Sequence, residues 1–157
     1  MIVAGAALAL ICSCNMKNPF LAESSAPFGA PEFDKITNEH YLPAFEAGIA
    51  EGKAEIDAIV ANTDEPTFEN TIVAMANSGE LLGRISGVFF VLNNCVTSPE
   101  MQQIALNITP KLTELSNDIS LNPQLFERIK VVYDQRKKLN LDEEDMMLLE
   151  DTYKGFA

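Results

Sequence analysis

The side chains best suited to acid–base or nucleophilic chemistry are few in this chain. It contains one histidine, His40, and three cysteines, of which only Cys95 lies outside the N-terminal apolar run. A catalytic thiol requires a nearby base, and His40 is far from Cys95 in the sequence. We therefore expect His40 to be a hydrogen-bonded histidine in the first turn of a helix, and Cys95 to be a small buried residue near a helix end.

Metal-binding patterns are equally sparse. A structural or catalytic zinc site needs two or more ligands of the histidine or cysteine class. The acidic run from Asp142 to Asp145 lacks the glycine turn and the spaced oxygens of a calcium loop, and we expect it in the first turn of a helix, where acids complement the helix dipole. The sequence holds no Ser/His/Asp set, phosphate loop or His-Glu-x-x-His motif. It therefore predicts no catalytic residue and no metal ligand in this chain.

The composition indicates an acidic globular protein. The chain has 157 residues, of which 47% are hydrophobic, a net charge of −12 and a pI of about 4.4. This length allows one domain with a substantial core. Binding to nucleic acid requires a basic patch that neutralises phosphates, and none is visible, so no nucleic-acid partner is expected.

The first residues have the character of an export signal. Residues 1–13 are apolar and rich in small side chains, yet too short to span a bilayer, which takes about 20 residues. Ile11-Cys12-Ser13-Cys14 resembles the lipobox of bacterial lipoproteins, so the signal would end at Cys14 and Cys14 would carry the lipid. We expect an exported protein in the cell envelope or periplasm of a bacterium, held at a membrane only by this lipid anchor. The alternatives are an ordinary cleaved signal or a misassigned start codon.

Residues 14–36 are predicted to form an extended, proline-rich segment. Proline fixes φ and disfavours helix at the residue before it. We expect this segment to run along the surface of the helices, anchored by its apolar side chains: Phe20, Leu21, Phe28, Phe33 and Ile36.

Residues 37–157 are predicted to form an all-α, antiparallel array of helices. Apolar residues recur at helical spacing over 37–62, 65–94, 98–119, 122–140 and 141–157. Each range opens on or near a capping residue: Thr37, Thr67, Ser98, Asn122 and Asp142. The range 65–94, which the rest is expected to pack around, is either one long helix or two helices that meet near Ser78-Gly79. The last range reaches Ala157 without a closing signal, so we expect the helical region to be incomplete.

Three glycines lie four residues apart in the range 65–94, at positions Gly79, Gly83 and Gly87. Each costs a helix roughly 1 kcal/mol relative to alanine. We therefore expect another backbone to pack closely against them. The alternative is an extended ligand that lies on this bare face.

A series of short motifs resembles one protein family, in the same order along the chain. Two of the blocks are the clearest, Glu39-His40-Tyr41 with Pro43-Ala44-Phe45-Glu46, and Pro66-Thr67-Phe68-Glu69-Asn70-Thr71. The others are Asn18-Pro19-Phe20-Leu21, Pro27-Phe28-Gly29, Phe33-Asp34-Lys35-Ile36, Ser78-Gly79, Val88-Phe89-Phe90, Pro110-Lys111-Leu112, Leu125-Phe126 and Leu148-Leu149-Glu150. Together they resemble the N-terminal region of the zinc metallopeptidases of the thimet oligopeptidase, oligopeptidase A and peptidyl-dipeptidase group, above all the bacterial peptidyl-dipeptidases.

The resemblance implies a clam-shaped, almost wholly helical peptidase with a deep channel, of which this chain forms the N-terminal part. In the family, zinc is held by a His-Glu-x-x-His helix and a further glutamate in the later half, and none of these residues exists here. The full-length protein would release dipeptides from the C-termini of oligopeptides. This chain would supply part of the channel wall, bind no zinc, be inactive alone, and have the missing C-terminal part of its own chain as partner.

A second hypothesis comes from a different class of function. The helices could form a free-standing, non-catalytic module at a membrane, which holds a peptide or protein in a groove between helices.

Overall fold

The computed structural model describes residues 18–22 and 24–157. The predicted signal over residues 1–13 and the predicted lipid site at Cys14 lie outside the described residues. Within them the regular structure is helical and includes no strand. The elements are η1 (Pro19–Leu21), η2 (Pro27–Gly29), α1 (Asn38–Ala61), η3 (Phe68–Val73), α2 (Ala74–Ala76), α3 (Glu80–Cys95), α4 (Pro99–Ser120), α5 (Pro123–Gln135), η4 (Arg136–Lys138) and α6 (Glu143–Phe156).

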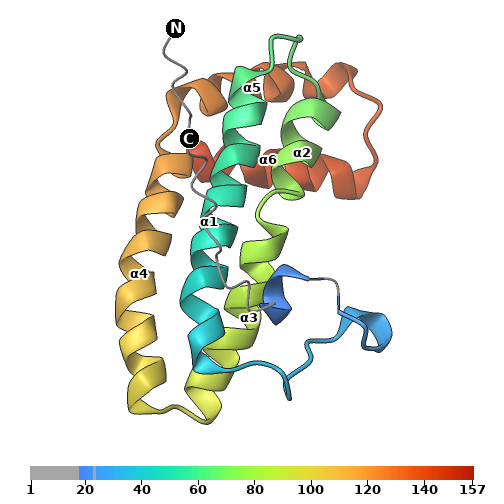
Figure 1. Cartoon of the computed structure of the whole chain (residues 1–157). Helices are drawn as coiled ribbons and strands as arrows, with labels where there is room; N and C mark the ends of the chain where they lie inside the picture. The colour runs from blue at the N-terminus through green and yellow to red at the C-terminus, as the bar shows by residue number, and fades with distance from the viewer. Residues whose placement is uncertain (1–17, 23) are drawn as a thin grey trace, which may run out of the picture.

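The longest helices form an upright layer, and the last two cross its end. α1 lies between α3 and α4 and packs against both. α3 runs opposite to α1 and to α4, and α5 and α6 lie across the end of the layer beside η3 and α2 (Figure 1). The all-α prediction is confirmed. None of the described helices is long and apolar enough to cross a membrane.

The predicted helix starts are confirmed by hydrogen bonds of the capping side chains. Ser98 accepts from the backbone N–H of Met101, and Asp142 accepts from that of Asp145. Asn122 accepts from two backbone N–H groups of α5 at 3.0 Å each. Such caps satisfy donors that a helix cannot satisfy by itself. The end predicted at residue 140 is wrong, because α5 stops at Gln135 and continues as the short turn η4.

The buried side chains form two clusters that share α1. The first core cluster joins the N-terminal half of α1 to η1, α3 and α4: Phe20, Tyr41, Ala44, Phe45, Ile85, Phe89, Met101, Ile104 and Ile108. The second core cluster joins its C-terminal half to η3, α5 and α6: Ile56, Ile59, Phe68, Ile72, Leu125, Ile129, Val132 and Leu149. α1 is therefore the element that holds the two clusters together.

The range 65–94 forms two helices, which meet where the sequence placed the break. The first begins as a π-helix at Phe68, with Thr67 as its cap, and the chain turns at Gly79 in a left-handed conformation (φ 74°) before α3. Glycine adopts this conformation at little cost. Of the two alternatives that the sequence left open, one long helix or two helices, the structure shows two helices.

The glycines that allow close helix packing are not the ones that the sequence suggested. A Cβ atom at Gly79, Gly83 or Gly87 would meet nothing within 4 Å among the described residues, so the prediction is wrong for Gly83 and Gly87, and at Gly79 the backbone of α1 approaches only the Cα atom. The close approach is instead at Gly48 in α1, where a Cβ would lie 3.1 Å from the Cα atom of Leu82 in α3. The buried Gly52, one turn further along α1, faces the Cα of Gly79. α1 and α3 thus come together through the glycines of α1.

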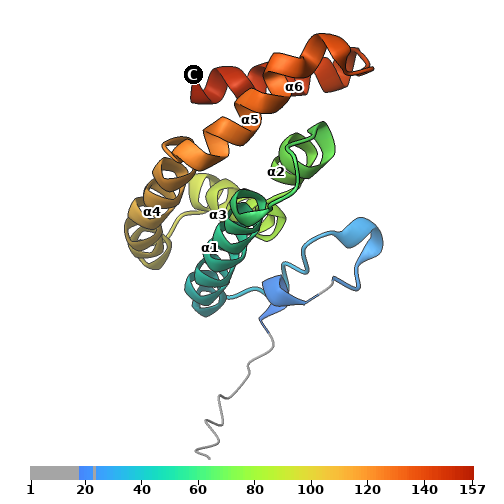
Figure 2. The same ribbon diagram turned by 90° about the horizontal axis from the view of Figure 1, so that it is seen from above.

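The segment before α1 is anchored at its two ends only. We call residues 18–22 and 24–36 the arm. Phe20 is buried and contacts the ring of Tyr41, with centroids 5.5 Å apart, and Ile36 packs against the first core cluster. Leu21, Phe28 and Phe33, which were predicted to be anchors, are exposed instead. Between its ends the arm stands away from the helices, as both views show (Figures 1 and 2).

Candidate functional site

The one histidine has a structural role. His40 lies in the first turn of α1, where its Nδ1 atom accepts a hydrogen bond of 3.0 Å from the backbone N–H of Thr37. The carbonyl of His40 accepts a further bond of 2.8 Å from the side-chain amide of Asn18 in the arm. The prediction of a hydrogen-bonded first-turn histidine is confirmed, and His40 also fixes the start of the arm.

Cys95 is the last residue of α3, as expected, but it is exposed rather than buried. The prediction of burial is wrong because the end of α3 extends past the helices that cover its middle. The exposed positions of Asn94, Cys95 and Val96 show this loss of cover.

The acidic residues do not form a metal site within the described residues. Asp142 caps α6, and Glu143, Glu144 and Asp145 occupy its first turn, as predicted from the helix dipole. Over residues 18–22 and 24–157, no group of three or more histidine, cysteine, aspartate or glutamate side chains could hold a metal ion. The donor set in this part of the chain does not fit the zinc that the family resemblance implies.

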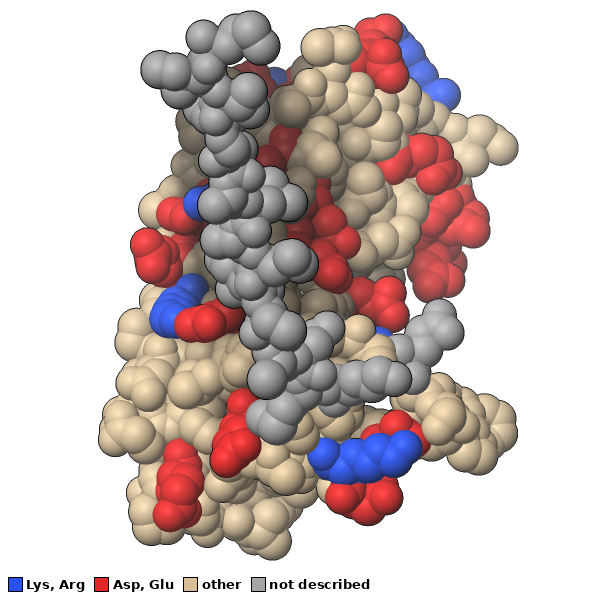
Figure 3. Space-filling view, viewed as in Figure 1, with Lys and Arg blue, Asp and Glu red and all other residues tan. Residues whose placement is uncertain are grey.

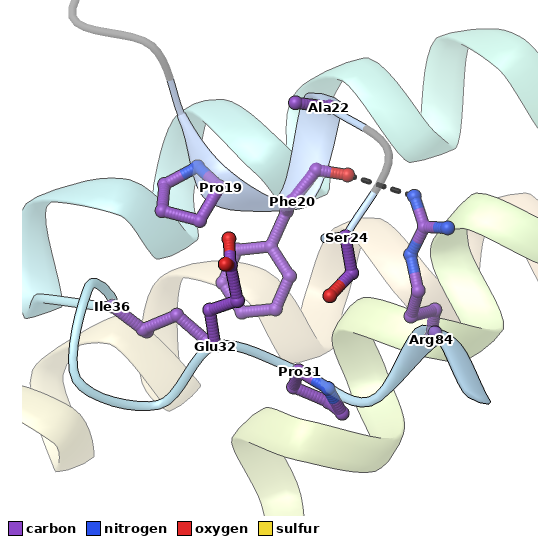
Figure 4. A pocket seen from close by; sticks show the side chains of 9 residues that line it. Pro19, Phe20, Ala22, Ser24, Pro31, Glu32, Ile36 and Arg84 are labelled. Carbon is purple, nitrogen blue, oxygen red and sulfur yellow. Dashed lines mark hydrogen bonds between the residues drawn. The ribbon is translucent and has the colours of Figure 1, made fainter. Parts of the chain in front are cut away.

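The best-formed cavity lies between the arm and α3 (Figure 4). It has a volume of about 290 Å³. Apolar side chains line it together with the carboxylate of Glu32 and the guanidinium of Arg84. The lining residues are Pro19, Phe20, Ala22, Ser24, Gly29, Pro31, Glu32, Ile36 and Arg84.

The polar side chains that line this cavity are already hydrogen-bonded to other groups of the arm. Arg84 of α3 donates a hydrogen bond of 2.8 Å from Nη2 to the carbonyl of Phe20 (Figure 4). The Ser24 hydroxyl donates to the carbonyl of Ala30 at 2.6 Å. Glu32 accepts from Lys35 Nζ and from Ser25 Oγ, each at 2.7 Å. These contacts fold the arm and tie it to α3, and they leave no activated nucleophile in the cavity.

The carboxylate of Glu32 is expected to titrate below the range of an ordinary glutamate. The hydrogen bond from Lys35, and then that from Ser25, lowers the pKa of Glu32. Because the folded pKa lies below the unfolded one, its stabilising effect is present above the unfolded pKa and lost as the pH falls through the folded pKa. A carboxyl NMR titration measures this. The variant Lys35→Met should move the midpoint upwards, and an unshifted midpoint in the unchanged chain would contradict the contact.

The most buried charged residue, Arg128 of α5, did not stand out in the sequence. Only 9% of the residue is exposed. Nη1 donates to the carbonyls of Asn62 (2.7 Å) and Asp64 (3.3 Å), and Nη2 donates to Oδ1 of Asn70 (3.2 Å). Its position three residues after Leu125, on the apolar face of α5, was the available signal. Arg128 joins α5 to the loop between α1 and η3.

The charged side chains on the surface are mostly acidic. Acidic side chains are spread over the face seen in Figure 3, and basic ones are fewer, in keeping with the net charge of −12. The prediction that the chain does not bind nucleic acid stays a prediction.

Comparison with known proteins gives the remaining evidence. No protein-family model matches the chain. It is 45% identical to the dipeptidyl carboxypeptidase of Escherichia coli over 140 residues, which are 89% of this chain and 21% of that protein. The dipeptidyl carboxypeptidase of Salmonella typhimurium is 41% identical with the same coverage, and oligopeptidase A of Escherichia coli is 29% identical over 76% of this chain and 17% of its own length. The chain thus spans about a fifth of the length of the curated relatives it matches.

Proposed function

Since the chain belongs to the peptidyl-dipeptidase and oligopeptidase A family of peptidases, we propose that it is the N-terminal helical region of such a peptidase. The observation that carries the proposal is the identity of 41–45% to two dipeptidyl carboxypeptidases over 89% of this chain. The full-length protein would hydrolyse short peptides and release dipeptides from their C-termini. Zinc would be its metal, held by residues outside this chain.

Within that protein, the proposed role of these helices is to form part of the wall of the substrate channel. The support is the placement of the reactive side chains. His40 is engaged at a helix start, the Ser24 hydroxyl donates to the carbonyl of Ala30, and Arg84 donates to the carbonyl of Phe20. A wall without catalytic groups would restrict access to short, unfolded peptides while the chemistry takes place elsewhere. The missing C-terminal part of the chain is its proposed partner.

A chimera tests this function. Residues 18–157 would replace the matched region of the Escherichia coli dipeptidyl carboxypeptidase, and release of dipeptides from a short peptide would be measured with zinc present. We expect the chimera to keep activity within about tenfold of that enzyme, since relatives of this identity share a core that tolerates volume-conserving changes. The isolated chain should show no hydrolysis.

Two results would contradict the proposal. A folded chimera without activity would argue against the proposal that these helices form part of the channel wall. Hydrolysis by the isolated chain, inhibited by a chelator, would place catalytic residues where we propose none. Tight peptide binding by the isolated chain, together with an inactive chimera, would favour the free-standing binding module.

We also propose that the protein is exported and anchored by a lipid on Cys14. The support is the lipobox-like sequence Ile11-Cys12-Ser13-Cys14 after an apolar run. Several acyl chains on one residue hold a protein on a membrane, whereas one chain binds only weakly. In a bacterial host, the variant Cys14→Ala is therefore expected to lose the lipid, and mass spectrometry of the N-terminus measures this. Fractionation should show that the variant leaves the membrane fraction for the soluble fraction wherever its signal is cleaved. Cys12→Ala is the matched control and should remain lipidated.

A further inference from the structure

Two phenylalanines of the arm present their rings to solvent. Phe28 is fully exposed, with 107% of its reference area accessible, and Phe33 is 57% exposed. Full exposure of an aromatic side chain forgoes the burial that stabilises such residues in a fold. Phe28 also has a left-handed backbone (φ 61°, ψ 20°), a conformation that is unfavourable for residues with a bulky side chain. Nothing within the described residues compensates for either feature.

The arm that carries these rings is held in shape by hydrogen bonds. The backbone N–H groups of Gly29 and Ala30 donate to the carbonyls of Ala26 and Pro27 at 3.2 and 3.3 Å. Ser24 and Glu32 close the loop from its two sides, through Ser24 Oγ to Ala30 O and Ser25 Oγ to Glu32 Oε1. The rings are therefore held outward on a closed loop, which stands away from the helices (Figure 2).

The length of the relatives indicates what covers this surface. The matched region is 21% of each dipeptidyl carboxypeptidase, so about four fifths of such a protein lies outside it. In the arm, Glu32 and Lys35 form an ion pair at 2.7 Å, so polypeptide can cover the loop without burying either of these charges unpaired. A membrane is the weaker candidate, because a chain with a net charge of −12 is repelled by anionic lipid.

We infer that Phe28 and Phe33 form a docking surface for the polypeptide that a full-length family member contains outside the matched region. The inference rests on the proposed function, since that function supplies the missing polypeptide. It adds a place of contact, the arm, to the partner proposed above. Docking would bury the two rings, and the free energy gained by this burial would offset the unfavourable backbone conformation of Phe28.

The test compares two double variants in the isolated chain and in the chimera described above. The arm variant is Phe28→Asn with Phe33→Asn, because asparagine tolerates the left-handed conformation of residue 28. The control is Leu106→Gln with Leu121→Asn, which removes two exposed leucines of α4 and its C-cap (68% and 79% exposed). Thermal unfolding of both proteins and the half-life of the chimera at raised temperature are measured.

In the isolated chain, both variants should unfold within about 3 °C of the unchanged protein, since exposed substitutions have small effects. In the chimera, the arm variant should shorten the half-life at raised temperature by roughly tenfold, and the control by less than twofold. An arm variant that behaves like the control in the chimera overturns the inference, as does a loss of stability in the isolated chain alone. Sedimentation that shows an arm-dependent dimer, or arm-dependent binding to anionic vesicles, assigns the surface to another occupant and also overturns it.

The activity of the parent chimera, which carries neither double variant, tests the proposed function separately from the docking surface. A parent chimera that folds without peptidase activity counts against the function, while its thermal unfolding still reports on docking of the arm. A parent chimera that does not fold counts against both.

Discussion

Replacing Gly48 with isoleucine is expected to lower the free energy of unfolding by about 3 kcal/mol, the upper part of the range for overpacked cores. The Cβ atom alone would lie 3.1 Å from the Cα and 3.2 Å from the backbone nitrogen of Leu82. Since these are backbone atoms, no rotamer change can relieve the contact, and α1 and α3 must move apart. That movement would loosen the first core cluster, in which both helices take part.

Heat and urea denaturation of the isolated chain measure this effect. A loss of this size corresponds to a fall in Tm of roughly 6–12 °C for a chain of this length. Gly83→Ala is the matched control, because a Cβ there meets nothing within 4 Å in the described part of the chain. This control should raise stability by up to about 1 kcal/mol through helix propensity alone. A Gly48→Ile variant with unchanged Tm would contradict the close approach of α1 and α3.

Substituting Arg128 by methionine is expected to cost about 3 kcal/mol, because each hydrogen bond that a charged group makes contributes roughly 1.5–3 kcal/mol and Arg128 donates several. The substitution removes the donor of the carbonyls of Asn62 and Asp64, while the side-chain oxygen of Asn70 keeps the donors of Thr67 and Thr71. Methionine fills most of the volume, so the loss reports on hydrogen bonds rather than on a cavity. Lysine should not rescue the variant, since one ammonium group cannot reproduce the fork of a guanidinium.

The control for this variant is Arg136→Met. The guanidinium of Arg136 lies 3.9 Å from the centroid of the Tyr133 ring and is only partly buried. Such a contact contributes about 0.5–1 kcal/mol. Urea denaturation with an unchanged m-value would separate the two variants, and amide exchange should show faster opening of residues 62–71 in Arg128→Met alone. Equal stability of the two variants would mean that Arg128 does not fix this loop.

The features that were predictable from sequence are those that depend on local interactions. A capping side chain reaches backbone groups two or three residues away, so Ser98, Asn122 and Asp142 could be assigned without the fold. The place of a break near Gly79 could be given for the same reason, since it depends on the conformation of one residue, but the sequence left open whether the range forms one helix or two. The family was predictable because many short motifs occur in one order, although no one motif is decisive.

The features that were not predictable depend on which surfaces meet. Glycines of α1 and α3 look alike in the sequence, and only the packing of the two helices shows that Gly48, and not Gly83, lies at the contact. The sequence predicts that an apolar residue such as Phe28 packs on the core, because it does not show whether the side chain faces the core or solvent. Arg128 reads as a solvent-exposed cation, because the carbonyls that it binds come from a loop more than 60 residues away.

The shared use of α1 has a consequence for how the molecule responds to change. Tyr41 and Phe45 at one end of this helix, and Ile56 and Ile59 at the other, belong to different clusters of buried side chains. Because a helix forms cooperatively, we expect that loss of order in one cluster destabilises the other through α1. A substitution near the arm is thus expected to shift the unfolding equilibrium of α5 and α6 as well. Calorimetry should then show a single heat-capacity peak for the whole region.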